Sequence, residues 1–359
     1  MQILFLIPYP LGQAPSQRFR FEQYFDVLKK NNIAFDYQSF IDENTWKILY
    51  KKGHFFQKTI GILLGFFRRI KILFFLHKYH FIFIHREAAP LFPPVLEFII
   101  AKIFRKKIIF DFDDAIWLPN TSEQNKISAF LKFHQKTGLI CKWAWKVSAG
   151  NVYLCDYARQ FNPHVVLNPT TIDTDWHAPT HNAIADKITI GWTGSHSTMK
   201  YLEEIVPIFQ DLEKSYPIDF LVISNQNPEL PLQNFKFIKW KKETEIEDLQ
   251  QIEIGVMPLT DDAWAKGKCG FKALQYMSLC TPALVSPVGV NTQIIQHEVN
   301  GFLCQTPADW ENALIKLIND ENLRKKIGSK AQKTVEEKYS VRSNTNNFLS
   351  LFTDNQRET

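Results

Sequence analysis

Short strand-like segments alternate with helical segments along almost the whole chain, and this alternation restricts the fold more than any other feature of the sequence. Strands that are separated by helices usually pair in parallel, as βαβ units. The predicted strands cover residues 3–8, 81–85, 107–112, 165–169, 187–194, 219–224, 235–240, 252–259 and 282–289. The sequence therefore predicts an α/β protein that is built on doubly wound parallel sheets.

The chain length and one irregular stretch divide this pattern into two domains. The chain has 359 residues, enough for two domains of ~150 residues each. Residues 168–187 contain Pro and several Thr and interrupt the alternation, as an interdomain linker would. We predict Rossmann-like domains over 1–175 and 176–340 that face each other across a cleft, where the strand carboxyl ends would bind ligands. A helix and tail over 341–359 would return to the N-terminal domain.

The composition excludes several classes of protein. With 45% apolar and 22% charged residues and no low-complexity tract, it is that of a globular protein. The five cysteines form no CxxC pair, which argues against a disulfide or zinc framework and favours a reducing cytoplasm. The apolar N-terminus lacks the basic region and cleavage site of a signal peptide, so it predicts a buried first strand.

Residues 44–86 form a basic segment with nine Lys or Arg and no Asp or Glu. Apolar and aromatic residues are interleaved with the cations, which favours a helix that lies on an anionic membrane surface. The longest apolar run, residues 60–67, is too short to cross a bilayer. The alternative is packing on the N-terminal sheet with snorkelled cations. No nucleic acid is expected, since no binding motif accompanies the patch. The predicted location is the cytoplasm, free or peripheral on the inner face of the plasma membrane.

Two glycine-containing loops of the second half have the chemistry of a diphosphate site. The stretch "AWAKGKCGFKALQYM" places three lysines and two glycines where a helix begins, and helix N-termini carry free N–H groups and a partial positive charge. In "GWTGSHSTMK" a glycine and a serine follow a strand in the same way. Solvated lysines are the alternative reading of the first loop. The predicted donor-binding residues of the two loops are Gly194, Ser195, Lys266, Lys268, Gly270 and Lys272.

Polar residues also follow two strands of the first half. His85, Arg86 and Glu87 end one strand, and Asp113 and Asp114 end the next, so all five are candidate catalytic residues at a carboxyl edge. A carboxylate there could orient an acceptor hydroxyl or accept its proton, although a helix cap is the alternative role. The stretch "DFDD" resembles a metal-binding DxD motif, but the alternation turns its first Asp into the sheet layer. No metal site is predicted.

The loop after the first strand adds candidate phosphate ligands. Arg18 and Arg20 fall where a helix starts and could bind a phosphate of the donor or of a lipid-linked acceptor through paired N–H groups. Solvation at the surface is the alternative for both.

The order of these motifs resembles glycosyltransferase family 4, whose members are retaining enzymes with the GT-B fold. The resemblance covers most of residues 1–340 and is most specific in "KCGFKALQYMSLCTPALVSPVGVNTQIIQHEVNGFLC". It implies transfer of a sugar from a nucleotide-sugar donor, held by the C-terminal domain, to a glycan or lipid-linked acceptor, held by the N-terminal domain, in surface polysaccharide or glycolipid synthesis. It also implies that no metal is needed and that the loop containing Gly12 is the family's flexible loop. Gly12 is therefore predicted, with Arg18 and Arg20, to bind the acceptor or a phosphate.

The sequence departs from the family pattern at three places. Two glutamates that usually lie in the donor site are replaced here by Gly267 and Gln275, of which Gln275 can still hydrogen-bond a ribose or sugar hydroxyl. Asp113 and Asp114 replace the usual His-Asp pair. The departures leave two alternatives open: a nucleotide-sugar epimerase or sugar-phosphate synthase of the same fold, and a catalytically silent binding subunit.

Overall fold

The computed structural model describes all residues except 50, 52, 120–132, 180–186 and 354–359. The chain forms two compact units, one of residues 1–170 and 344–359 and the other of residues 171–343. We call them unit 1 and unit 2. The last helix, α16 (Val341–Ser350), starts in unit 2 and continues into unit 1.

Unit 1 is built on a parallel sheet of six strands in the order β2-β1-β3-β4-β5-β6. The strands are β1 (Gln2–Ile7), β2 (Ala34–Ser39), β3 (Phe81–His85), β4 (Lys107–Phe112), β5 (Lys146–Ala149) and β6 (Val165–Leu167). Its other elements are α1 (Pro15–Arg18), η1 (Glu22–Tyr24), α2 (Phe25–Lys30), α3 (Glu43–Leu49), α4 (Phe55–Leu73), η2 (Leu76–Lys78), α5 (Val95–Phe98), η3 (Ile99–Ile103), α7 (Lys136–Trp143) and α8 (Val152–Arg159). β2 and β5 were not predicted.

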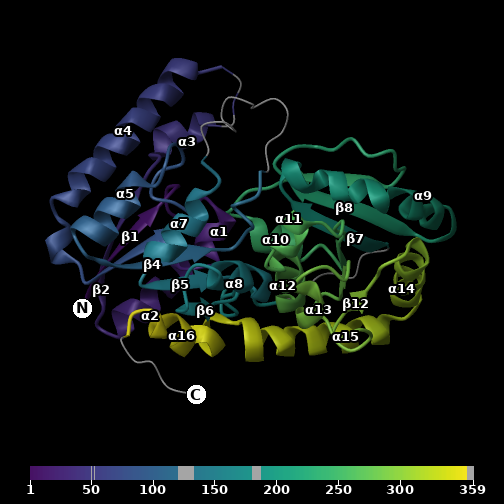
Figure 1. The fold of residues 1–359 in the computed structure, drawn as a ribbon. Coiled ribbons are helices and arrows are strands. Elements are labelled where there is room, and N and C mark those ends of the chain that lie inside the picture. The colour runs from purple at the N-terminus through teal and green to yellow at the C-terminus, as the bar shows by residue number, and fades with distance from the viewer. Residues whose placement is uncertain (50, 52, 120–132, 180–186, 354–359) are drawn as a thin grey trace. The chain divides into compact units, whose positions relative to one another are not determined.

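The chain runs from β1 outward to β2 and then back past β1 to β3, so the direction of strand addition reverses. Because crossovers are right-handed, helices on the two sides of this reversal cover opposite faces of the sheet. Figure 1 shows α4, α5 and α7 on one side of the sheet and α2 and α16 on the other. The core between the sheet and α16 is aromatic: Phe348 stacks on Tyr24, and Phe352 lies against Phe5 and Phe83. The C-terminal segment is therefore an integral part of unit 1.

Unit 2 repeats the design with a second parallel sheet, in the order β12-β11-β10-β7-β8-β9. The strands are β7 (Ile188–Gly194), β8 (Ile218–Ser224), β9 (Phe235–Lys239), β10 (Ile254–Met257), β11 (Ala283–Val285) and β12 (Phe302–Leu303). The helical elements are η5 (His196–Glu204), α9 (Val206–Ser215), α10 (Glu245–Leu249), α11 (Ala263–Lys266), α12 (Phe271–Ser278), α13 (Asn291–Ile294), α14 (Pro307–Asn319), α15 (Glu321–Thr334) and η6 (Val335–Tyr339).

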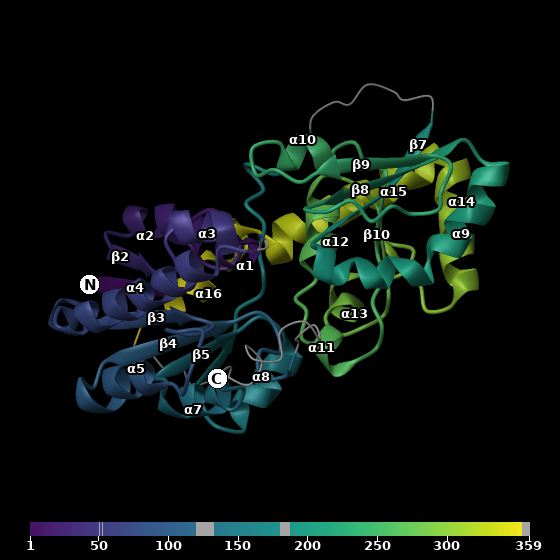
Figure 2. The ribbon, with the colours of Figure 1, turned by 90° about the horizontal axis from the view of Figure 1, so that it is seen from above.

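The core of unit 2 lies between its sheet and the paired helices α9 and α14, which Figure 2 shows side by side. Trp192 of β7 is fully buried in it. On the other face, α12 packs against β10 and β11 with six of its eight residues buried. The strand–loop–helix segment from β10 to α12 is the one in which the sequence places the anion site.

Candidate functional site

The N-terminus of α12 gathers the predicted donor residues of unit 2. Gly270 is the N-cap and adopts φ 69°, a left-handed conformation that favours glycine. A Cβ on Gly270 would lie 2.3 Å from the side chain of Ile294, so the position also lacks room for any other residue. The first N–H groups of a helix have no partner within it, and an anion can bind them.

Lys272, in the first turn of α12, meets the end of β7. The Thr193 N–H donates to the Tyr276 hydroxyl at 2.9 Å, which ties β7 to α12. Gly194 follows at once, and a Cβ there would lie 2.8 Å from Lys272 Nζ. The ammonium also lies 4.2 Å from the centroid of the Trp192 ring. The lack of a side chain at Gly194 therefore leaves room for the Lys272 ammonium at the end of β7. The two loops that the sequence singles out thus lie next to each other.

The ammonium of Lys272 has no acidic partner among the residues that the structure describes. Burial, and secondly the charge of Lys268, lower the pKa of the Lys272 ammonium well below its usual value. Within the described part of the chain no carboxylate pairs with it; its polar neighbour is Thr198 Oγ1 at 3.5 Å. A desolvated cation without a counter-ion is unfavourable by itself and favours an anionic ligand.

Two buried donors beside this cation also lack partners. Gln275 follows Lys272 by three residues, on the same side of α12, and is 2% exposed, yet no described residue offers its Nε2 a hydrogen bond. The same holds for Trp192 Nε1. Because buried N–H groups are normally paired, ligand oxygens are the natural partners here.

The remaining predicted donor residues surround this centre less closely. Lys268 is half-buried and near enough for its charge to act on Lys272. Lys266 is half-buried, with 45% of its side chain exposed, and forms an ion pair with Asp261 at 3.2 Å. Ser195 holds the N-cap position of η5. All three lysines are half-buried, and burial lowers the pKa of Lys272.

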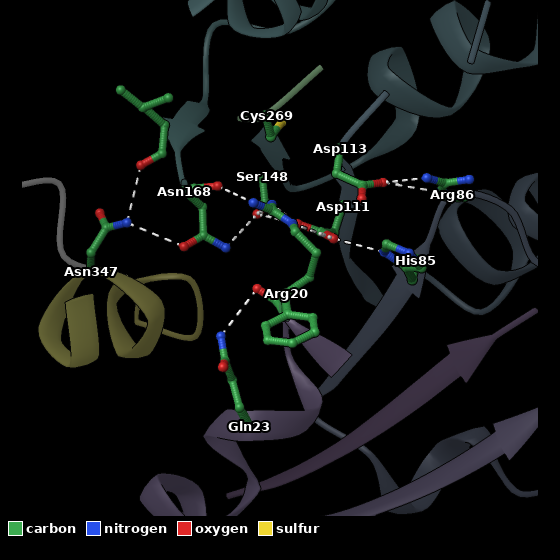
Figure 3. A network of polar contacts seen from close by, with 12 residues as sticks. Arg20, Gln23, His85, Arg86, Asp111, Asp113, Ser148, Asn168, Cys269 and Asn347 are labelled. Atoms are coloured by element: carbon green, nitrogen blue, oxygen red, sulfur yellow. Dashed lines mark hydrogen bonds and ion pairs between the residues drawn. The ribbon is translucent and has the colours of Figure 1, made fainter. Parts of the chain in front are cut away.

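In unit 1, the carboxyl ends of β3 and β4 bring Arg86 together with both aspartates. The guanidinium donates to Asp113 Oδ1 from Nε at 3.0 Å and from Nη2 at 2.7 Å (Figure 3). Its Nη2 also donates to Asp114 Oδ2 at 2.5 Å. Burial lowers the pKa of Arg86, but the two carboxylates outweigh it and raise that pKa above its ordinary value. The three side chains are partly exposed, so they can meet a solute.

Arg86 adopts φ 62°, which is strained for a residue with a side chain, and buried charges fix the loop after it. Arg69 of α4 donates to the Ala88 carbonyl at 2.8 Å, and the Glu97 carboxylate accepts from the Ala88 N–H at 2.9 Å. Lys136 donates to the Ala89 carbonyl at 3.0 Å and pairs with Glu87. We call Arg69, Glu97 and Lys136, which hold this loop, the loop clamp. Glu87 pairs with the clamp, which is a different role from the catalytic one predicted for it.

His85 and Arg20 belong to a buried network below the edge. Asp111 is fully buried and binds Arg20, His85 Nδ1 at 2.8 Å and the Ser148 hydroxyl, which donates at 2.6 Å (Figure 3). Burial raises the pKa of Asp111, but Arg20 and His85 outweigh it and hold that pKa well below its usual range. The interpretation of Arg20 as a phosphate ligand is corrected: its guanidinium is 1% exposed and already bound to Asp111 and the Asn168 carbonyl.

Gly12 is also occupied by the protein. Its φ is 75°, and its N–H donates to Glu22 Oε2 at 2.8 Å. A phosphate at that N–H would have to displace a carboxylate, so its predicted role in phosphate binding is not supported by this geometry. Arg18 ends α1 and lies 4.9 Å from the ring of Phe19, partly exposed.

The clamp residues Arg69, Glu97 and Lys136 were missed by sequence reasoning, and the signal that could have found them is weak. Glu97 is a lone acid inside the apolar stretch "LFPPVLEFIIAKIF", which is unusual unless the charge is paired in the interior. For the described residues, no group of three or more His, Cys, Asp or Glu is arranged to hold a metal ion.

Comparison with known proteins gives one family and one fold. Residues 178–334 match the model of the family described as "Glycosyl transferases group 1". No curated protein sequence matches. Sucrose-phosphate synthase from Thermosynechococcus elongatus has a similar structure, with a TM-score of 0.70 at 13% identity over 98% of both chains.

Two further structures resemble the whole chain. HepE from Anabaena, in complex with UDP and glucose, has a TM-score of 0.68 at 15% identity over 99% of this chain and 100% of its own. A glycosyltransferase from Rickettsia africae has a TM-score of 0.66 at 13% identity over 100% of this chain and 99% of its own. The chain therefore has the GT-B fold with a glycosyl transferase group 1 domain in its second half, and it is a glycosyltransferase.

Proposed function

We propose that the protein transfers a sugar from a nucleoside-diphosphate sugar to a hydroxyl of a glycan or lipid-linked acceptor. The observation that carries this proposal is the ammonium of Lys272, which lies at a helix N-terminus beside Gly194 with no counter-ion from the described part of the chain. A diphosphate would supply the missing charge. HepE, which shares the fold, binds UDP and UDP-glucose, and UDP is accordingly the first nucleotide to test.

In the proposed reaction the bond between the sugar C1 and the diphosphate oxygen breaks while C1 bonds to the acceptor oxygen. Lys272, with Lys268 and the amides near Gly194 and Gly270, would stabilise the charge that develops on the leaving diphosphate. The proton of the acceptor hydroxyl passes to an oxygen of the departing phosphate. Gln275 would donate its free N–H to a ribose or sugar hydroxyl. This scheme uses cationic side chains and helix amides where other enzymes use a metal ion.

The stereochemical outcome and the pathway follow from the resemblance of residues 252–303 to family 4. It supports retention of the anomeric configuration, with attack on the face that the diphosphate leaves. It also supports a role in surface polysaccharide or glycolipid synthesis in the cytoplasm. NMR of the anomeric proton of the first product measures the configuration at C1. An inverted configuration would contradict this part of the proposal.

Binding of the donor can be tested without knowing the acceptor. UDP-glucose should raise the melting temperature of the protein in a concentration-dependent way, because a ligand that binds the folded state stabilises it by mass action. GDP- and ADP-glucose provide the comparison of nucleotides, and glucose alone is the control. No shift with any nucleotide sugar would contradict the proposal.

Asp113 should affect transfer without affecting the donor. Arg86 holds its carboxylate at the edge of unit 1, where it can orient an acceptor hydroxyl, while the donor residues lie in unit 2. Asp113→Asn should therefore lower the rate of transfer by about 10²–10³ and leave the thermal shift with UDP-glucose unchanged. Asp26→Asn, an exposed carboxylate of α2 that pairs with Lys29, is the matched control. Loss of donor binding in Asp113→Asn would mean that the aspartate serves the donor.

A further inference from the structure

Helix α4 is inserted into unit 1 with its small and charged residues inward. Gly61 and Gly65 face the protein: a Cβ on Gly61 would lie 2.2 Å from the Thr45 hydroxyl, and one on Gly65 would lie 2.7 Å from the Phe40 carbonyl. Arg69 continues this inner face and is 1% exposed. A surface helix of a globular protein normally turns its apolar stripe inward. In α4 the buried positions are instead the two glycines and Arg69, and many of its apolar side chains remain exposed.

The outer face of α4 is a continuous apolar stripe. Its positions recur at intervals of three and four residues, as one side of a helix requires. The exposed members, from 39% to 83% exposed, are Phe55, Phe56, Ile60, Leu63, Leu64, Phe67, Ile70, Phe74 and Phe75. Figure 1 shows α4 at the periphery of unit 1. Contiguous exposed apolar surface of this length marks an interaction site.

The neighbouring helix extends this surface. Ile62 and Phe66 of α4 share a small core with Leu96 of α5, so the two helices pack together. Phe92, which precedes α5, lies 5.9 Å from Phe66 by ring centroids and is 50% exposed. The outward side chains of α5, η3 and the residue after it are Val95, Phe98, Ile103 and Phe104. We call α4 and this second helix the apolar face.

The charges within the segment that forms the apolar face are almost all positive. Between residues 44 and 110 the only acids are Glu87 and Glu97; Glu97 is buried and Glu87 pairs with Lys136. The exposed cations of the two helices and their ends are Lys51, Lys71, Lys78, Lys102 and Arg105. Arg68 and Arg69 do not belong to them, because they bind Asp42 and backbone carbonyls of unit 1. The sequence-based interpretation of the whole basic segment as a lipid-facing surface is corrected at these two positions.

We infer that the apolar face docks on an anionic lipid bilayer. Its aromatic and aliphatic side chains would enter the interface while the lysines at its margin meet the headgroups. A second copy of the chain fits less well, since a two-fold contact would bring like cations together. No helix in the described residues is long and apolar enough to cross a membrane, so the contact is with the surface. The inference deepens the proposed function, on which it rests for the acceptor: a docked enzyme reaches lipid-linked hydroxyls.

Flotation with vesicles tests this directly. The full-length protein should float with vesicles of phosphatidylcholine and phosphatidylglycerol at low salt, and raised salt should release it in part, because the Debye length shortens to ~8 Å at physiological ionic strength. Leu63→Ser combined with Phe67→Ser should lower the partition coefficient at least about tenfold, since both side chains would leave the interface. Lys71→Gln combined with Lys102→Gln should lower the partition coefficient onto the anionic vesicles about fivefold for each charge removed. Binding to vesicles of phosphatidylcholine alone should not change.

Matched controls distinguish binding by the apolar face from nonspecific binding of exposed aromatic side chains to vesicles. Trp176→Ser removes an aromatic side chain that is 75% exposed in unit 2 and should leave flotation unchanged. The inference is overturned if the wild-type protein does not bind the anionic vesicles. It is also overturned if the protein is a dimer in solution and Leu63→Ser with Phe67→Ser dissociates the dimer but leaves flotation unchanged. The thermal shift with UDP-glucose, measured without vesicles, reports donor binding alone. Flotation without that shift would therefore contradict the proposed function and support the apolar face.

Discussion

Lys272→Met is expected to lower the turnover number by about two to three orders of magnitude, the effect of losing one preorganised donor to a developing anion. Methionine keeps the volume and the stem of the side chain and removes only the charge. The loss should appear in kcat with donor at saturation, measured as release of the nucleoside diphosphate. Lys316→Met, which breaks an exposed ion pair with Glu298 elsewhere in unit 2, should leave kcat unchanged.

The same substitution should stabilise the unliganded protein, and this separates a role in the reaction from a role in folding. A lysine whose pKa is lowered by burial destabilises the folded state at pH values below its pKa in the unfolded chain, because folding must either release its proton or retain a disfavoured charge. Lys272→Met removes that cost at neutral pH. A variant that is inactive and also less stable to urea would instead mark Lys272 as a structural residue.

Arg20→Met is expected to cost about 3–5 kcal/mol of unfolding free energy, because it leaves Asp111 buried without its cation. Asp111 and Arg20 are both fully enclosed, and the network includes His85 and Ser148. Urea unfolding at neutral pH measures the loss. The matched control is Arg159→Met, which removes an exposed ion pair with Asp156 and should change stability by less than about 1 kcal/mol.

The acid limb of stability checks the same network. The pKa of Asp111 is lowered in the folded state, so its contribution is complete above the unfolded-state pKa of about 3.9 and is lost as the pH falls toward the folded-state value. Arg20→Met should therefore flatten the fall in stability below about pH 4. An unchanged slope would show that Arg20 does not set the ionisation of Asp111.

The positions of most strands and of the donor loops could be predicted because their signals are local. A buried parallel strand is a short apolar run, and the loop before α12 carries its glycines and lysines within ten residues of sequence. β2 was missed because half of its residues, "AFDYQS", are polar and it lies at the sheet edge. β5 and β12 were missed because they are only four and two residues long. Strands of this kind depend on their neighbours more than on their own composition.

The unit 1 network could not be predicted, because its members are far apart in the chain. Arg20 and Asp111 are separated by 91 residues, and nothing in either segment indicates the other. The orientation of α4 is hidden for a different reason: the helical period is the same whichever face is buried. Only the contacts of Gly61 and Gly65 show that the glycine face is inside.

The guanidinium of Arg69 links the position of α4 to the conformation of the loop after Arg86. It joins three carbonyls, those of Ile7 in β1, Gln38 in β2 and Ala88 in the loop after Arg86, to the inner face of α4. A displacement of α4 therefore changes the hydrogen bonds that keep Arg86 in its strained conformation. Thermodynamic reciprocity then applies: if a bound surface tightens acceptor binding by some factor, bound acceptor must tighten attachment to that surface by the same factor.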